Sequence, residues 1–311
     1  MSVQRATFGR VGTVVSGIAL KNPVFAAAGT AGFGESVPYD LSLLGGIMTK
    51  GTSPDPWRGN PLPRVAEVPA GMLNAIGLEN PGMERVAAEL LPGLARHDLA
   101  VVVNVVGRTL DEYRRVVAYL SPCPRVDAFE INVSCPNVSE GGLAFGRDPA
   151  AAAAVVAACR DVTAKPLWVK LTPNTLDPVA VAEGVVRAGA DAVTLINTVL
   201  GMRIDPRTRR PVLAAGVGGL SGPAVRPVAV RMVYEVARAV DVPVIGMGGI
   251  VTAEDALEFI LAGARAVAVG TANLVDPWAA VKVAQGLEAF ARREGLDSLD
   301  ALVGAAGSRR P

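Results

Sequence analysis

The sequence is short of histidine and cysteine, and this excludes several kinds of chemistry. It has one histidine, His97, among 311 residues, so neither a multi-histidine metal site nor a histidine base is expected. Its three cysteines, Cys123, Cys135 and Cys159, cannot form a closed set of disulfides and include no CxxC pair. The sequence therefore predicts no zinc or iron–sulfur site within this chain.

Long apolar runs and an excess of one charge are also missing. Lys and Arg total 30 against 29 Asp and Glu, unlike the strongly basic balance of a nucleic-acid or anionic-membrane binder. The most apolar stretch, 150–159, is far shorter than the roughly 18 residues of a membrane span. Residues 1–12 lack the apolar core of a signal peptide. We therefore expect a cytoplasmic protein that acts on a small molecule and binds neither nucleic acid nor a membrane.

What the sequence does contain is a repeated alternation of short apolar runs and helical segments. Eight runs are expected to be parallel strands: 23–28, 46–50, 100–106, 127–133, 166–171, 191–197, 242–247 and 266–270. Several, such as VVVNVV, are apolar on consecutive residues, as strands covered on both faces are. No GxGxxG follows the first strand. The pattern predicts an α/β protein, a single-domain (β/α)8 TIM barrel over residues 1–311, with an open doubly wound sheet as the alternative.

Three connections are longer than ordinary loops, and we expect them to be irregular and functional: 52–82, 134–147 and 198–222. Each follows a predicted strand, so a barrel would place all three on its C-terminal face, where active sites of this fold are built. Between strands, Asp148 before Pro149 predicts a helix start, and Thr252 with Asp255 predicts a capping box.

Glycine-containing pairs end the last two predicted strands. Gly248-Gly249 and Gly270-Thr271 each precede a predicted helix. Glycine lets an anion approach the backbone, and unpaired N–H groups at a helix start favour negative charge. Such glycines could also serve only as tight turns, but two pairs on adjacent strands favour a ligand that carries a phosphate.

Amides and ammonium groups occur where apolar strands end. Asn104, Asn132 and Asn197 lie at or near the ends of three predicted strands, and Lys50 and Lys170 close two others. Buried polar groups need partners, and a polar, anionic ligand would provide them. The alternatives are strand-end capping for each asparagine and an outward salt bridge for each lysine. A Schiff-base lysine of an aldolase-type barrel is also possible.

Cys135 is the most distinctive thiol, because it lies in NVSCPN at 132–137, just past the fourth predicted strand. The following proline disfavours helix, so the thiol is expected on the catalytic face. Only about 3 % of an unperturbed thiol is ionised at pH 7, so a cysteine base would act better at alkaline pH. Cys123 and Cys159 are expected to be packing thiols.

Seven segments occur in a characteristic order: MTKG (48–51), NAIGLENPG (74–82), NVSCPNV (132–138), KLTPN (170–174), NTVLGM (197–202), GGLSGP (218–223) and GMGGI (246–250). Together they resemble the dihydroorotate dehydrogenases of class 1, and most of all the class 1B catalytic subunit. The resemblance runs nearly end to end. It implies an FMN-binding TIM barrel, an oxidoreductase that converts (S)-dihydroorotate to orotate in pyrimidine biosynthesis.

The resemblance implies a role for each candidate residue. Cys135 matches the catalytic base that removes the C5 proton while hydride leaves C6 for flavin N5. Lys50 matches a contact of both flavin and substrate carboxylate, and Lys170 matches a lysine that stabilises negative charge on the reduced flavin. The implied substrate-binding set is Lys50, Asn74, Ala75, Ile76, Gly77, Leu78, Asn132, Asn197 and Thr198. The implied cofactor-binding set is Ala28, Lys50, Gly51, Asn104, Asn132, Lys170, Ile196, Gly222, Gly248, Gly249, Gly270 and Thr271.

Two positions depart from the family pattern: Ala28 stands where many relatives have serine, and Glu79 where glutamine is usual. Class 1B also implies a partner subunit carrying FAD and a 2Fe–2S cluster, which passes electrons to NAD⁺, in a heterotetramer built on a homodimer of this chain. The alternatives are a class 1A enzyme that uses fumarate and a flavin enzyme like dihydropyrimidine dehydrogenase. Lys50 argues against the latter because dihydrouracil has no carboxylate.

Overall fold

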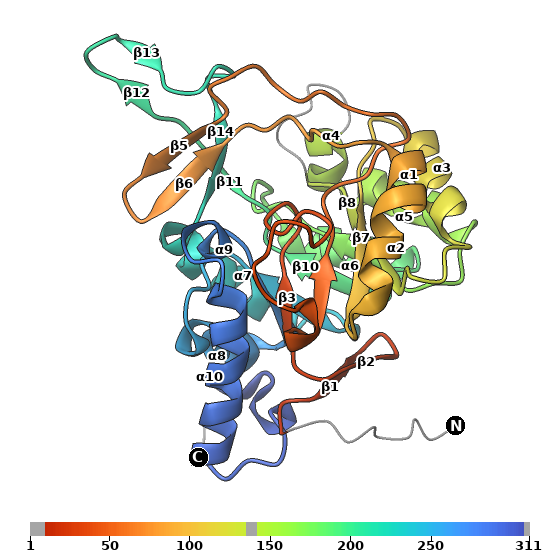
Figure 1. Cartoon of the computed structure of the whole chain (residues 1–311), viewed down its shortest axis with the longest axis vertical. Helices are drawn as coiled ribbons and strands as arrows, with labels where there is room; N and C mark the ends of the chain where they lie inside the picture. Colours follow the sequence, from red (N-terminus) through yellow and green to blue (C-terminus); the bar gives the residue numbers. More distant parts are fainter. Residues whose placement is uncertain (1–9, 135–141, 308–311) are drawn as a thin grey trace.

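The computed structural model describes residues 10–134 and 142–307, and within them eight parallel strands close into a barrel (Figure 1). In sequence order they are β3 (Val24–Ala26), β4 (Gly46–Met48), β7 (Ala100–Val105), β8 (Ala128–Asn132), β9 (Leu167–Lys170), β10 (Ala192–Leu195), β15 (Val244–Met247) and β16 (Ala264–Val269). Every predicted strand overlaps one of them. The TIM-barrel prediction is confirmed, and the open-sheet alternative is wrong. That 1–311 is one domain stays a prediction.

Helices cover the outside of the barrel. The longer ones are α3 (Leu110–Leu120), α5 (Pro149–Arg160), α6 (Pro178–Arg187), α7 (Arg226–Val236), α8 (Ala253–Ala262) and α10 (Ala279–Arg293). A continuous helical stretch before β7 consists of α1 (Met83–Arg85), η2 (Val86–Leu90), α2 (Leu91–Gly93) and η3 (Leu94–Arg96). Shorter turns are η1 (Leu41–Leu43), α4 (Gly142–Arg147), η4 (Pro223–Val225), α9 (Ala272–Val275), η5 (Asp300–Leu302) and η6 (Ala305–Gly307).

Both predicted helix starts are confirmed. The Asp148 carboxylate accepts a hydrogen bond from the backbone of Ala150 at the start of α5, and Thr252 and Asp255 form the capping box of α8. The first crossover departs from the repeat, because only η1 lies between β3 and β4, and α10 packs against β3 instead.

The interior of the barrel is apolar at its N-terminal end. Alternate residues of each strand point inward, and Phe25, Val102, Trp168 and Ile245 pack together there. A hairpin of β1 (Thr13–Val15) and β2 (Ile18–Leu20) adds buried side chains to this cluster and lies at that end in Figure 1. The outward residues of the strands pack against the helices in a second, larger core.

Two of the three long connections contain strands, so the expectation that they are irregular was wrong. β5 (Val65–Val68), β6 (Gly71–Asn74), β11 (Val199–Gly201) and β14 (Gly218–Ser221) form an antiparallel sheet, and β12 (Ile204–Asp205) pairs with β13 (Arg210–Pro211). Figure 1 shows this sheet above the barrel, opposite the β1–β2 hairpin. The pairing joins distant segments, such as Leu73 with Leu220, so no local periodicity reveals it.

Candidate active site

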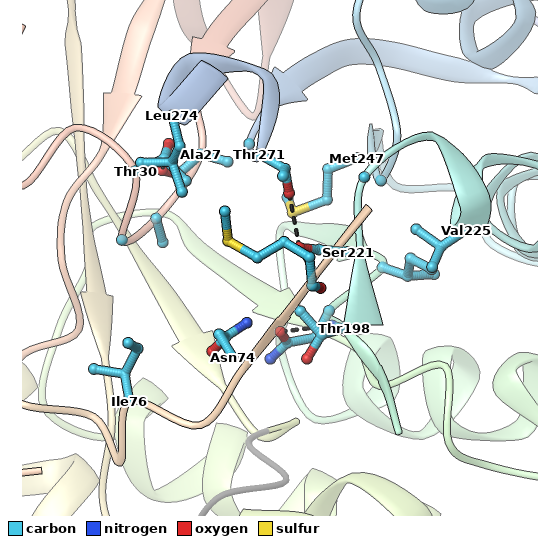
Figure 2. A pocket seen from close by; sticks show the side chains of 18 of the residues that line it. Ala27, Thr30, Asn74, Ile76, Thr198, Ser221, Val225, Met247, Thr271 and Leu274 are labelled. Atoms are coloured by element: carbon cyan, nitrogen blue, oxygen red, sulfur yellow. Dashed lines mark hydrogen bonds between the residues drawn. The ribbon is translucent and has the colours of Figure 1, made fainter. Parts of the chain in front are cut away.

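A cavity of about 250 Å³ opens where the barrel strands end. All eight barrel strands or the residues directly after them contribute to its wall, and β6 and β14 of the added sheet cover it. In Figure 2, Asn74 and Ile76 lie below and Thr271 and Met247 above. The hydroxyl of Thr271 donates to that of Ser221 at 2.8 Å, which ties β14 to the end of β16.

Most of the predicted site residues line this one cavity: Ala28, Lys50, Gly51, Asn74, Ile76, Leu78, Asn104, Asn132, Lys170, Ile196, Asn197, Thr198, Gly222, Gly248, Gly249, Gly270 and Thr271. Two predicted substrate residues, Ala75 and Gly77, are not part of its wall. Ala75 is buried and packs with Leu73 and Leu213. Cys135 lies outside the described residues. Where these residues lie is thus established, and what each of them binds stays a prediction.

The predicted lysines are both at the cavity. Lys170 is only 6 % exposed, and within the described ranges no carboxylate lies at ion-pair distance from its ammonium. Among the described residues, Lys170 therefore does not form the outward salt bridge that was the alternative expectation. The Lys50 ammonium lies close to the backbone of Gly29, where an added Cβ would be 3.8 Å from Nζ. Two ammonium groups at one cavity favour an anionic ligand.

Two of the strand-end asparagines hold the chain directly before Cys135. Asn132 Oδ1 accepts from the backbone N–H of Ser134 at 3.2 Å and from its hydroxyl at 2.8 Å. Asn197 Nδ2 lies 2.7 Å from Ser134 Oγ, and Tyr113 donates to the carbonyl of Asn132 at 2.8 Å. Both amides thus have partners within the protein, as the strand-end alternative expects, and both also line the cavity.

The third asparagine belongs to a buried network that the sequence analysis missed. Asn104 Nδ2 donates to Glu130 Oε2 at 2.5 Å, and the Thr194 hydroxyl donates to Glu130 Oε1 at 2.7 Å. Glu130 and Thr194 are fully buried. A signal was available, because Glu130 is a charged residue inside an apolar strand, two residues from Asn132 and therefore on the same inward face.

Asn174 was also missed, although it lies in a segment that carries the family resemblance. Its Nδ2 donates to the carbonyl of Thr198 at 3.0 Å, and its Oδ1 accepts from the backbone of Leu200 at 2.9 Å. Asn174 therefore fixes the chain where it leaves β10 and enters β11.

The backbone conformation after β15 favours glycine, and the same glycines border the cavity. Gly248 and Gly249 have φ of +122° and +81°, and Gly222 has φ of +98°. A Cβ on Gly249 would lie 2.8 Å from the carbonyl oxygen of Gly222. The tight-turn interpretation therefore holds for Gly248 and Gly249, and their backbone also borders the cavity.

Other expectations can be placed. Burial raises the pKa of the Cys159 thiol to about 12, in keeping with a packing role. Glu79, which departs from the family pattern, pairs with Arg64 at 2.8 Å.

Among the residues with described positions, no group of His, Cys, Asp and Glu could hold a metal ion. In the same part of the chain, no helix is both long and apolar enough to cross a membrane.

The family model described as dihydroorotate dehydrogenase matches residues 10–291. This chain belongs to the dihydroorotate dehydrogenase family. It is 52 % identical over 297 residues to the dihydroorotate dehydrogenase B (NAD(+)), catalytic subunit, of Geobacillus kaustophilus (strain HTA426), covering 95 % of both chains. To the protein of the same name from Bacillus caldolyticus it is 51 % identical, again over 95 % of both chains.

A third dihydroorotate dehydrogenase B (NAD(+)), catalytic subunit, that of Desulforudis audaxviator (strain MP104C), is 53 % identical over 299 residues, 96 % of this chain and 97 % of the relative. The resemblance drawn from seven short segments is thereby confirmed, including its class 1B assignment.

Proposed function

We propose that this protein oxidises (S)-dihydroorotate to orotate in pyrimidine biosynthesis, with FMN in the cavity and a second subunit that passes electrons to NAD⁺. The observation that carries the proposal is the convergence of Lys50, Lys170, Asn132 and Asn197 on one cavity. They converge in a chain about half identical to dihydroorotate dehydrogenase B catalytic subunits over nearly its whole length.

The residues at the cavity fit an anionic, hydrogen-bonding cofactor such as FMN. The Lys170 ammonium is nearly buried and meets no carboxylate among the described residues, so it would stabilise the negative charge that a flavin ring carries once it is reduced. Gly248 and Gly249 border the cavity with their backbone, and backbone N–H groups of this kind can bind a phosphate. When bound, FMN supplies the oxidant for the reaction, taking up a hydride equivalent from C6 of the substrate.

The side chains of this chain supply the rest of the chemistry. Cys135 Sγ, as thiolate, takes the proton from C5 while the hydride leaves C6, so that the C5=C6 double bond of orotate forms. Asn132 and Asn197 position the chain at Ser134, the residue before this base, and Lys50 binds the substrate carboxylate. The amides of Asn74 and Asn197 are suited to the imide edge of the substrate, because an amide both donates and accepts.

The acceptor assignment follows from the relatives. Their shared name includes both NAD(+) and "catalytic subunit", which describes part of a larger enzyme. We infer the same arrangement here, with FAD and a 2Fe–2S cluster on the partner subunit, a homodimer of this chain within a heterotetramer, and a cytoplasmic location.

An anaerobic absorbance spectrum of the purified protein tests the proposal. Dihydroorotate should bleach the flavin band, and neither NAD⁺ nor fumarate should restore it without the partner subunit. Reoxidation by fumarate would assign the chain to the fumarate-dependent class 1A. A flavin-loaded protein that dihydroorotate does not bleach, but dihydrouracil does, would overturn the substrate assignment.

A further inference from the structure

The buried carboxylate of Glu130 is not explained by packing or by an ion pair. It is fully buried in the barrel interior, and no basic side chain of the described residues lies at ion-pair distance from it. Its hydrogen-bond partners are the amide of Asn104 and the hydroxyl of Thr194. Burying a carboxylate without a counter-charge destabilises a fold, so the position is expected to serve the site above it.

The chemistry of a carboxylate determines which way the neighbouring amide points. The NH₂ group of Asn104 faces Glu130 and donates to Oε2 of its carboxylate, which serves as the acceptor. The other end of the amide, Oδ1, then faces away from Glu130. It lies near Gly51, where an added Cβ would be 3.2 Å from it, and both residues line the cavity.

We propose that Glu130 is a positioning residue that fixes the Asn104 amide so that its carbonyl oxygen faces the cofactor. The inference rests on the proposed function, because the ligand in question is FMN. The ring system of oxidised FMN carries one N–H group, in its imide, and Asn104 Oδ1 offers an acceptor to such a donor. A reversed amide would present its NH₂ group instead. Thr194 holds the second carboxylate oxygen, so the carboxylate cannot turn away.

The variant Glu130→Gln tests this orientation with almost no change in volume. Its amide oxygen accepts from Thr194, and its NH₂ group then points toward Asn104, whose amide must reverse. FMN should dissociate at least roughly tenfold more readily, as expected when a buried acceptor is replaced by a donor. The loss is measured as the rise of FMN fluorescence when the loaded protein is diluted. The melting temperature of the protein freed of FMN should not fall, because the variant buries no charge.

The double variant Glu130→Gln, Asn104→Asp provides the decisive comparison. It exchanges the two groups, so a carboxylate at 104 accepts from the amide at 130 and still offers an acceptor to the cavity, with the same net charge. It should regain most of the FMN affinity. Asn104→Asp alone should bind FMN poorly, since it places two carboxylates side by side. Asp127→Asn is the matched control, because Asp127 pairs with Arg125 at the opposite end of β8, and it should retain FMN like the unmodified protein.

The outcomes separate this inference from the proposed function. Unchanged FMN retention in Glu130→Gln, or no recovery in the double variant, overturns the inference even if dihydroorotate bleaches the flavin normally. A lowered melting temperature in Glu130→Gln with unchanged FMN retention assigns Glu130 a structural role and also overturns it. Recovery in the double variant supports it, even if dihydroorotate fails to reduce the unmodified protein and the proposed reaction is wrong.

Discussion

The two ends of the barrel interior differ in chemistry, although the same strands build both. At the N-terminal end, Phe25 and Trp168 pack edge to face with ring centroids 5.6 Å apart. At the C-terminal end of the same interior, Glu130 and Lys170 are buried, and neither has an oppositely charged partner among the described residues. Aromatic packing stabilises a fold, whereas such charges lower its stability. The difference indicates that one end holds the fold together and the other serves a ligand.

The largest expected effect belongs to the C-terminal end. Replacing Cys135 with alanine should leave FMN bound but slow flavin reduction by dihydroorotate roughly 100- to 10,000-fold, the usual contribution of a general base. Stopped-flow absorbance under anaerobic conditions measures the rate. Cys123→Ala is the control and should reduce at the normal rate, because Cys123 does not line the cavity. Near-normal reduction in the Cys135 variant would remove its assignment as base.

At the N-terminal end, a substitution is expected to change the stability of the fold. Trp168→Ala should lower the free energy of unfolding by about 3–5 kcal/mol through the cavity it leaves, as measured by urea unfolding. Trp168→Phe should lower the free energy of unfolding much less, because an aromatic ring remains. The Nε1 group that it removes is buried and has no hydrogen-bond partner among the described residues, so no hydrogen bond is lost. Equal losses in the two variants would show that the ring volume does not matter, and the contrast between the two ends would fail.

Two lysines extend the comparison: Lys165 lies just before β9, and Lys170 is its last residue. Lys170→Met should slow flavin reduction about 100-fold through the lost positive charge, while the melting temperature stays equal or rises. Lys165 instead donates to the backbone carbonyls of Cys123 and Val126. Lys165→Met should therefore lower the free energy of unfolding by about 1–3 kcal/mol and leave the reduction rate unchanged. If both variants slow flavin reduction, or both lower the free energy of unfolding, the proposed difference between the two lysines is wrong.

The smallest expected effect concerns the helical layer outside the barrel. Burial raises the pKa of Cys159 from 9.0 to about 12, so the unfolded chain releases its thiol proton at lower pH than the folded one. The stability due to this thiol is complete below about pH 9 and declines toward pH 12, by about 1 kcal/mol at pH 10. The stability difference between the unmodified protein and Cys159→Ala should shrink accordingly between pH 8 and pH 10. A difference that does not vary with pH would contradict the buried, neutral thiol.

Much of the fold and part of the site could be predicted. The eight apolar runs predict the barrel strands because each is buried on both faces, and the cap residues predict the starts of α5 and α8. Lys50, Lys170 and the strand-end asparagines stand out because such residue types are unusual where they occur. The added sheet was missed because its strands are short and pair across the sequence, as Leu73 does with Leu220.

The sequence by itself determined which segments are strands, which family the chain belongs to, and which residues lie at the strand ends. These features could be predicted because they depend on local patterns of apolar and polar residues. Only the tertiary structure decided which polar groups are partners. Asn104, Glu130 and Thr194 come from three strands, and their hydrogen bonds exist only once the barrel has closed. Hydrogen bonds depend on distances of a few tenths of an ångström, and only the folded backbone sets these.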